Sequence, residues 1–112
     1  MKKINVDGVN YVEEKEQISS DYVVVRTMSA GVHAGYLKSR KGKEVTLTNT
    51  RRLWYWKGAA TLSQVAGSGI TEPDNCKFPA PIQEITLTEA IEVIPCTEKA
   101  KIIIKGVKEW VK

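Results

Sequence analysis

Arginine and tryptophan alternate in one short segment, and these are the residues of the chain best suited to bind a ligand. The segment reads Arg51-Arg52-Leu53-Trp54-Tyr55-Trp56-Lys57. Guanidinium groups form planar, paired hydrogen bonds with phosphate, and exposed indoles offer a nucleobase a surface on which to stack. The segment therefore predicts a site for an anionic ligand that carries a base. The same residue types are also frequent in cores and at subunit interfaces, so each indole has two alternative roles, ligand contact or packing.

Small and hydroxyl-bearing residues form a second group that favours the same ligand. The run Arg26-Thr27-Met28-Ser29-Ala30-Gly31 ends a predicted strand with a tight turn, where glycine allows close approach of the backbone to a ligand and hydroxyls can contact phosphate oxygens. His33 follows as an alternative donor to the edge of a base. We expect three arginines to include the main phosphate contacts and one indole to stack on a base. The candidate ligand-binding residues are Arg26, Thr27, Ser29, Gly31, His33, Arg51, Arg52, Trp54 and Trp56.

The charge distribution supports an anionic ligand. The formal net charge is +4, but residues 22–71 contain eight basic residues and one acid, so this region carries +7 and the rest of the chain −3. Local positive charge concentrates anions and speeds their arrival. A basic surface also serves solubility, so the charge by itself does not identify a ligand.

The sequence offers little for catalysis or for metal binding. His33 is the sole histidine and has no carboxylate beside it in the sequence, so a nucleophilic triad is not indicated. A lone histidine in a strand is more often structural. Cys76 and Cys96 are 20 residues apart and match no paired metal-ligand spacing, which favours two reduced thiols. We therefore predict a binding protein that is not an enzyme, with no cofactor, no metal and no catalytic residues.

The elements that would position these residues predict an α+β fold. Alternation of apolar and polar residues predicts an antiparallel sheet, a meander of about five to six strands, with strands at 22–28, 32–40, 43–50, 51–58 and 82–94. The dipeptide Lys41-Gly42 is the expected turn between the second and third strands, and Pro95 is expected to end the last one.

Two helices complete the predicted core. A short helix at residues 59–66 would follow the fourth strand, begin near Thr61 and end at Gly67, and a proline-rich surface loop would occupy residues 68–81. From Thr97 a threonine cap predicts a C-terminal helix, although the isoleucines at 102–104 would suit a strand equally well.

One domain of residues 1–112 is expected, because a chain of this length builds one modest core. It would consist of an N-terminal β-hairpin at 1–12, a polar connector at 13–21 and the core at 22–112. No apolar run approaches the roughly 20 residues of a membrane helix, and no signal peptide follows the basic start, so a cytoplasmic location is expected. Three Trp and four Tyr in one small chain, with an exposed end strand, favour a homo-oligomer with its pocket at a subunit boundary.

Three blocks of the sequence resemble signature blocks of a family of small phage-encoded proteins grouped as a domain of unknown function. The blocks are residues 26–35, 51–59 and 87–95, and the resemblance covers residues 22–97. That family is in turn similar to the phage Thoeris anti-defence sponge proteins. The resemblance implies an antiparallel sheet core with C-terminal helical elements, assembled as a homo-oligomer with pockets at subunit boundaries.

The same resemblance implies a function in the cytoplasm of an infected host. Sponge proteins bind cyclic ADP-ribose isomers released by TIR-domain enzymes and withhold them without cleaving them. We therefore expect a phage anti-defence protein that sequesters a cyclic nucleotide signal, a cyclic ADP-ribose isomer or a small cyclic oligonucleotide. The alternative is a small phage protein that binds single-stranded or duplex nucleic acid, because the same arginines and tryptophans would serve it. A virion or interaction protein without a small ligand is a third reading.

Overall fold

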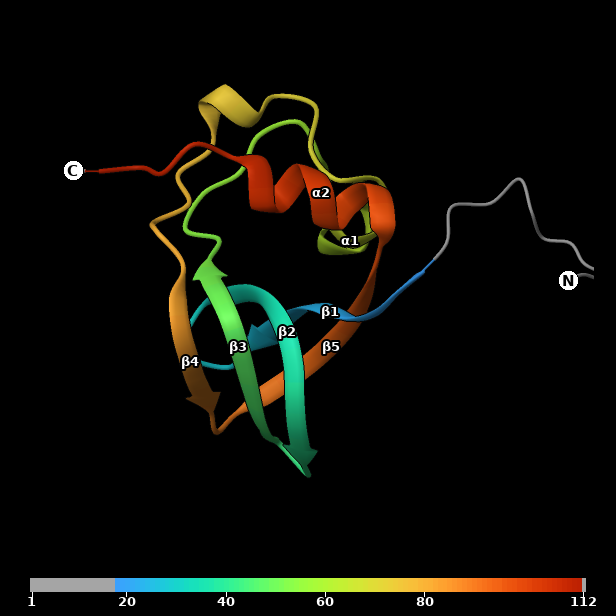
Figure 1. The fold of residues 1–112 in the computed structure, drawn as a ribbon, viewed down its shortest axis with the longest axis vertical. Coiled ribbons are helices and arrows are strands. Elements are labelled where there is room, and N and C mark those ends of the chain that lie inside the picture. The colour runs from blue at the N-terminus through green and yellow to red at the C-terminus, as the bar shows by residue number, and fades with distance from the viewer. Residues whose placement is uncertain (1–17, 112) are drawn as a thin grey trace, which may run out of the picture.

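The computed structural model describes residues 18–111, in which a five-stranded antiparallel sheet carries two helices on one face (Figure 1). The strands are β1 (Ile18–Thr27), β2 (Val32–Lys41), β3 (Glu44–Arg52), β4 (Ile82–Leu87) and β5 (Ala90–Thr97), arranged in the order β4-β3-β2-β1-β5. The helices are α1 (Leu62–Ser68) and α2 (Glu98–Gly106), and a 3₁₀ turn, η1 (Pro73–Asn75), lies between α1 and β4. The predicted α+β class with an antiparallel sheet is thereby confirmed.

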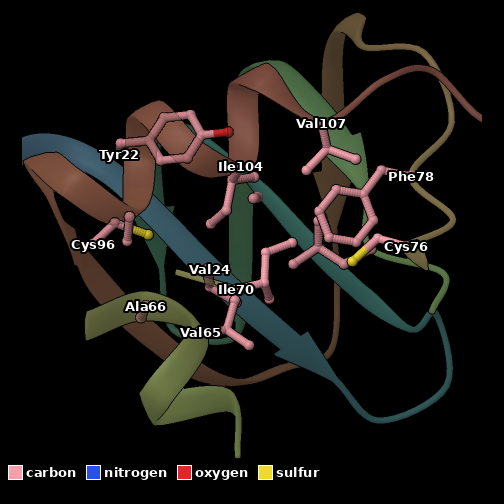
Figure 2. Packing of buried hydrophobic residues seen from close by; sticks show 13 residues of the cluster. Tyr22, Val24, Val65, Ala66, Ile70, Cys76, Phe78, Cys96, Ile104 and Val107 are labelled. Carbon is pink, nitrogen blue, oxygen red and sulfur yellow. The ribbon is translucent and has the colours of Figure 1, made fainter. Parts of the chain in front are cut away.

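The main core lies between the helices and the sheet (Figure 2). Tyr22 and Val24 of β1 are fully buried against Val65 of α1 and Ile104 of α2. Val23 and Val25, the alternate residues of β1, are also buried, but in a second cluster on the opposite face of the sheet. Both faces of β1 are therefore apolar, which explains its unbroken run of β-branched residues.

The second cluster is shielded because the sheet curls. β4 and β5 are the two edge strands, yet only Thr88 and Glu89 separate them in sequence. Two linking residues span at most about 11 Å between Cα atoms, whereas the edges of a flat five-stranded sheet are roughly 19 Å apart. The edges must converge at this end, where the Ala90 amide donates to the Lys43 carbonyl at 3.0 Å. Val45, Leu47 and Leu87 thus become buried although no helix within residues 18–111 belongs to this cluster.

A β-bulge in β3 changes which residues face each cluster. Tyr36 pairs with Thr48 and Ala34 with Arg51, so that Asn49 and Thr50 lie opposite the single residue Gly35. Asn49 has a positive φ of 45°, a conformation that asparagine tolerates better than most residues. Before the bulge, Val45 and Leu47 face the second cluster, and after it, Leu53 lies in the first. The extra residue therefore turns the odd-numbered residues, Arg51 included, towards the helices.

Threonine caps fix the starts of both helices as predicted. The Thr61 hydroxyl accepts a hydrogen bond from the Gln64 amide, and the Thr97 hydroxyl accepts one from the Ala100 amide. The isoleucines at 102–104 are helical, so the structure resolves the choice that their sequence left open. No helix within residues 18–111 is long and apolar enough to cross a membrane.

Several predicted boundaries are wrong, each for a local reason. Residues 18–21 belong to β1 rather than to a connector, while the predicted N-terminal hairpin lies outside the described residues. The turn after β2 is formed by Gly42 and Lys43, one residue later than expected. α1 continues through Gly67 and ends at Gly69, which has the positive φ that suits a helix end.

Two predicted strands also differ. The chain leaves the sheet after Arg52, so residues 53–58 form no fourth strand, and α1 follows the third strand; only an isolated bridge joins Tyr55 to Lys77. The predicted strand 82–94 is two strands, because the chain turns at residues 88–89. Pro95 does not end β5 but pairs with Val23. An edge strand tolerates proline because one of its sides needs no amide donor.

The tight approach of β2 and β3 at the bulge makes a testable prediction. A Cβ at Gly35 would lie 2.5 Å from Cβ and 2.9 Å from Cα of Thr50, so Gly35→Ala must displace backbone. We expect a loss of roughly 1 to 3 kcal/mol in the free energy of unfolding, measured with urea. Gly67→Ala is the control, because a Cβ there meets nothing within 4 Å and the helix should gain roughly 0.5 to 1 kcal/mol. Equal effects of the two substitutions would contradict this account.

Candidate functional site

The turn between β1 and β2 is held by its own side chains. The Thr27 hydroxyl donates to the Gly31 carbonyl at 2.8 Å and accepts from the Ala30 amide at 2.8 Å. Nε2 of His33 lies 2.8 Å from the Ala30 carbonyl oxygen. Gly31 has a φ of +82°, so a side chain there would be strained. The small residues predicted to line a site thus shape a fixed turn at the end of the sheet.

A cavity of about 200 Å³ opens beside this turn. Its polar side is formed by His33, Thr50, Arg51 and Arg52, and its apolar wall by Pro79, Ala80, Ile82 and Ile85. His33 and Arg52 are paired across β2 and β3, and Ile82 and Ile85 come from β4 (Figure 1). A shallower hollow of about 430 Å³ adjoins it, lined by Thr48, Asn49, Pro81, Ile82 and Gln83. Ile82, half exposed, lines both.

Arg52 brings an uncompensated positive charge to the cavity. Its side chain forms no hydrogen bond or ion pair with any residue in the described part of the chain, and it is partly exposed. A Cβ placed on Gly31 would lie 3.8 Å from its Nη1, so the guanidinium lies against the turn described above. A free guanidinium beside an apolar wall suits an anionic group attached to a less polar body.

Arg51 has a different position, although it is the neighbouring residue. It is only 4% exposed and donates four hydrogen bonds to backbone carbonyls: Nε to Pro79 at 3.0 Å, Nη1 to Ile104 at 3.2 Å and to Val107 at 2.9 Å, and Nη2 to Phe78 at 2.9 Å. Burial lowers the pKa of Arg51 from its ordinary value, but a guanidinium stays charged at neutral pH. At most one of its five N–H donors is left for a ligand.

The remaining candidate residues lie apart from the cavity or are used within the fold. Arg26 forms an ion pair with Glu92 at 3.0 Å, and the Ser29 hydroxyl donates to the Glu89 carboxylate at 2.8 Å. Trp56 packs on the main core, whereas Trp54 is 62% exposed and follows Arg52 by two residues. The structure therefore brings together Thr27, Gly31, His33 and Arg52, with Arg51 behind them.

The cavity wall was missed by the sequence analysis. Pro79, Ala80, Ile82 and Ile85 lie in or after a segment that was assigned to a surface loop. The two prolines at 79 and 81 were a usable signal, because they fix backbone torsions and donate no hydrogen bonds. Within residues 18–111 no three His, Cys, Asp or Glu side chains are grouped so that they could hold a metal ion. Cys76 and Cys96 are both free and buried, and burial raises the pKa of the Cys96 thiol to about 12.

A comparison with family models assigns the chain. A model described as a domain of unknown function (DUF6948) matches residues 20–104, which span β1 to most of α2 and include every residue of the cavity. The chain therefore belongs to the DUF6948 family. No curated protein and no solved structure matches it.

We expect substitutions of the two arginines to differ strongly in their effect on stability. Arg51→Lys replaces the guanidinium that donates hydrogen bonds to four backbone carbonyls. We therefore expect the free energy of unfolding to fall by roughly 2 to 4 kcal/mol. Arg52→Lys should change it by less than about 0.5 kcal/mol, because the guanidinium has no partner to lose among the described residues. Urea unfolding of both variants measures the difference. A similar loss in the two variants would contradict the assigned roles.

His33 predicts how stability depends on pH. Burial, and secondarily the nearby Arg52 charge, lower the pKa of His33 below 6.5 against one opposing hydrogen bond. As the pH falls through the unfolded value of about 6.5, the unfolded chain binds a proton that the folded chain does not, so stability decreases. Because His33 is the sole histidine, unfolding between pH 7 and pH 5 reports this group. We expect the decrease in the wild type and a flatter profile in His33→Gln; identical profiles would contradict it.

Proposed function

We propose that this protein binds and sequesters a small cyclic nucleotide signal in the cytoplasm of an infected host, without converting it chemically. One observation carries the proposal: the Arg52 guanidinium, which has no partner within residues 18–111, lies beside His33 in a cavity whose other wall is apolar. The cation suits a phosphate, and Pro79, Ala80 and the two isoleucines of β4 suit the flat or aliphatic parts of a nucleotide.

The size of the site favours a ligand with more than one part. Pockets that enclose a complete small molecule usually have about 300 to 1,000 Å³. The cavity of about 200 Å³ is smaller, but it shares Ile82 with the adjoining hollow of about 430 Å³. A ligand held by Arg52 would therefore extend over Ile82. Trp54 lies within about 7 Å of Arg52 along the backbone, and its exposed indole is available for a base that projects from the cavity.

Sequestration requires affinity alone. A dissociation constant below micromolar corresponds to more than about 8 kcal/mol of binding free energy. A charged hydrogen bond to phosphate contributes about 1.5 to 3 kcal/mol and a stacked base about 1 to 3 kcal/mol, so a few such contacts in a preformed pocket approach this value. The fixed turn and the proline-bearing wall reduce the ordering cost of binding.

The cyclic nature of the ligand rests on the resemblance to the phage Thoeris anti-defence sponge proteins. That resemblance makes a cyclic ADP-ribose isomer the first ligand to consider, with small cyclic oligonucleotides second. It also makes the homo-oligomer part of this proposal: a second chain would complete a pocket that one chain leaves open above Ile82.

Calorimetry with cyclic ADP-ribose isomers and small cyclic oligonucleotides tests the proposal. We expect at least one of them to bind at or below micromolar concentration. Arg52→Ala should weaken that binding by roughly 1.5 to 3 kcal/mol, about 10- to 150-fold, without loss of folding.

Arg26→Ala and Arg40→Ala are matched controls, because each removes one arginine outside the cavity. Both should leave the affinity nearly unchanged. Absence of heat with every ligand at tens of micromolar would reject the proposal. Equal losses of affinity in the three variants would show that Arg52 has no special role in the binding site.

Nucleic-acid binding is the second candidate, and one feature favours it. The tip of the β2–β3 hairpin carries Arg40, Lys41 and Lys43, all exposed, at the end of the sheet away from the helices (Figure 1). A polyanion bound there would release many counterions, so its affinity would fall steeply with salt. Anisotropy with mixed oligonucleotides at two salt concentrations separates the candidates. Tight, salt-sensitive binding that Arg40→Ala weakens more than Arg52→Ala would replace the first proposal with this one.

A further inference from the structure

The hydrogen bond of His33 determines which of its two nitrogens remains for a ligand. A neutral imidazole has one N–H donor and one lone-pair acceptor. The Ala30 carbonyl oxygen, 2.8 Å from Nε2, can only accept, so Nε2 carries the proton. Nδ1 is then a bare acceptor. His33 is therefore not the donor to a base that its sequence context predicts, because its N–H is already used within the turn.

Nδ1 has no partner among residues 18–111, although His33 is only 2% exposed. Buried polar atoms are nearly always hydrogen-bonded, so an acceptor without a described partner, on a residue that lines a cavity, calls for a ligand group or water there. The low exposure also disfavours the protonated ring: desolvation and the Arg52 charge lower its pKa and keep Nδ1 able to accept.

Arg52 is placed to bind an anionic part of the same ligand. It is directly opposite His33 across β2 and β3, and paired residues in a sheet have Cβ atoms about 4.5 to 5.5 Å apart. An anion held by Arg52 and a donor held by Nδ1 can therefore belong to neighbouring parts of one ligand. In a ribonucleotide, the sugar hydroxyls and the phosphate ester are attached to the same ribose, whereas the amino groups lie farther away on the base.

We infer that the cavity binds a ribosyl phosphate, with Arg52 on the phosphate and Nδ1 of His33 accepting a hydrogen bond from a free ribose hydroxyl. This inference rests on the proposed function and names the part of the nucleotide that enters the cavity. A cavity of about 200 Å³, below the size that usually encloses a complete small molecule, accommodates a sugar with its phosphate but leaves the base outside. The site consequently distinguishes ribose from deoxyribose.

Nitrogen-15 NMR of the free protein tests, without any ligand, whether Nε2 rather than Nδ1 of His33 carries the proton. Because the chain has one histidine, its imidazole gives a single pair of nitrogen resonances. At neutral pH we expect the Nε2–H form, with Nδ1 unprotonated. A protonated Nδ1 would overturn the inference, whatever the protein binds.

Binding of deoxy analogues tests whether a ribose hydroxyl donates a hydrogen bond to Nδ1. We use cyclic ADP-ribose and the analogues in which each ribose hydroxyl in turn is replaced by hydrogen. We expect one analogue to bind the wild type about tenfold more weakly than the parent, as expected for one lost hydrogen bond. The Nδ1 resonance should shift with the parent and with the other analogues, but not with that one. His33→Gln is the matched variant, because its amide nitrogen can still donate to Ala30 while no acceptor occupies the Nδ1 position.

In His33→Gln the tenfold difference between the parent and that analogue should disappear. If this variant does not fold, the analogue series and the Nδ1 resonance of the wild type decide the matter. Equal affinity of the wild type for the parent and all analogues would overturn the ribose inference and leave sequestration intact. No binding of the parent or any analogue would overturn the ribose inference, whereas the proposed function would fail only if the wider panel of cyclic oligonucleotides also gave no heat.

Discussion

The buried guanidinium of Arg51 is the interaction on which the arrangement of the site depends. It has no carboxylate partner among its hydrogen bonds and is stabilised by four carbonyl oxygens. Two of these belong to the end of α2, where a positive charge also interacts favourably with the helix dipole, and two belong to Phe78 and Pro79. One side chain of β3 thereby joins the last helix to the segment that forms the apolar wall of the cavity. A buried cation without these acceptors would carry a large desolvation cost, so the wall and the helix are positioned together.

Because consecutive residues of a strand point to opposite faces, the position of Arg51 determines that of Arg52. Arg51 is directed to the main core and is hydrogen-bonded there. Arg52 is directed to the turn and the cavity, and its hydrogen-bonding groups have no partner in the described part of the chain. The two residues are identical in type and adjacent in sequence, yet one is structural and the other is available to a ligand. The charge that a ligand experiences comes mainly from Arg52, since the charge of Arg51 is already surrounded by carbonyl dipoles.

The features that the sequence predicted correctly are those with a local cause. Thr61 and Thr97 carry their capping signal within four residues, and Val23 to Val25 identify a strand by side-chain type alone. The features it missed depend on distant contacts. The pairing of β1 with β5, the convergence of the edge strands and the bulge at Asn49 all result from tertiary packing. For the candidate site, the residues near the first turn could be grouped from the sequence because they are close in it, whereas Pro79 and Ile82 approach them only through the fold.

The bulge at Asn49 also determines how the chain can vary in length. On β3, two residues occupy the space opposite Gly35, but the pairing of Tyr36 with Thr48 and of Ala34 with Arg51 requires only one. A relative that lacks residue 49 would keep both pairs and both arginines on their present faces. A deletion of one residue elsewhere in β3 has no such slack, because it would shift the register by one and turn the residues on one side of it to the opposite face. A single-residue gap in an alignment of related chains is therefore compatible with the site at the bulge, and incompatible with it elsewhere in β3.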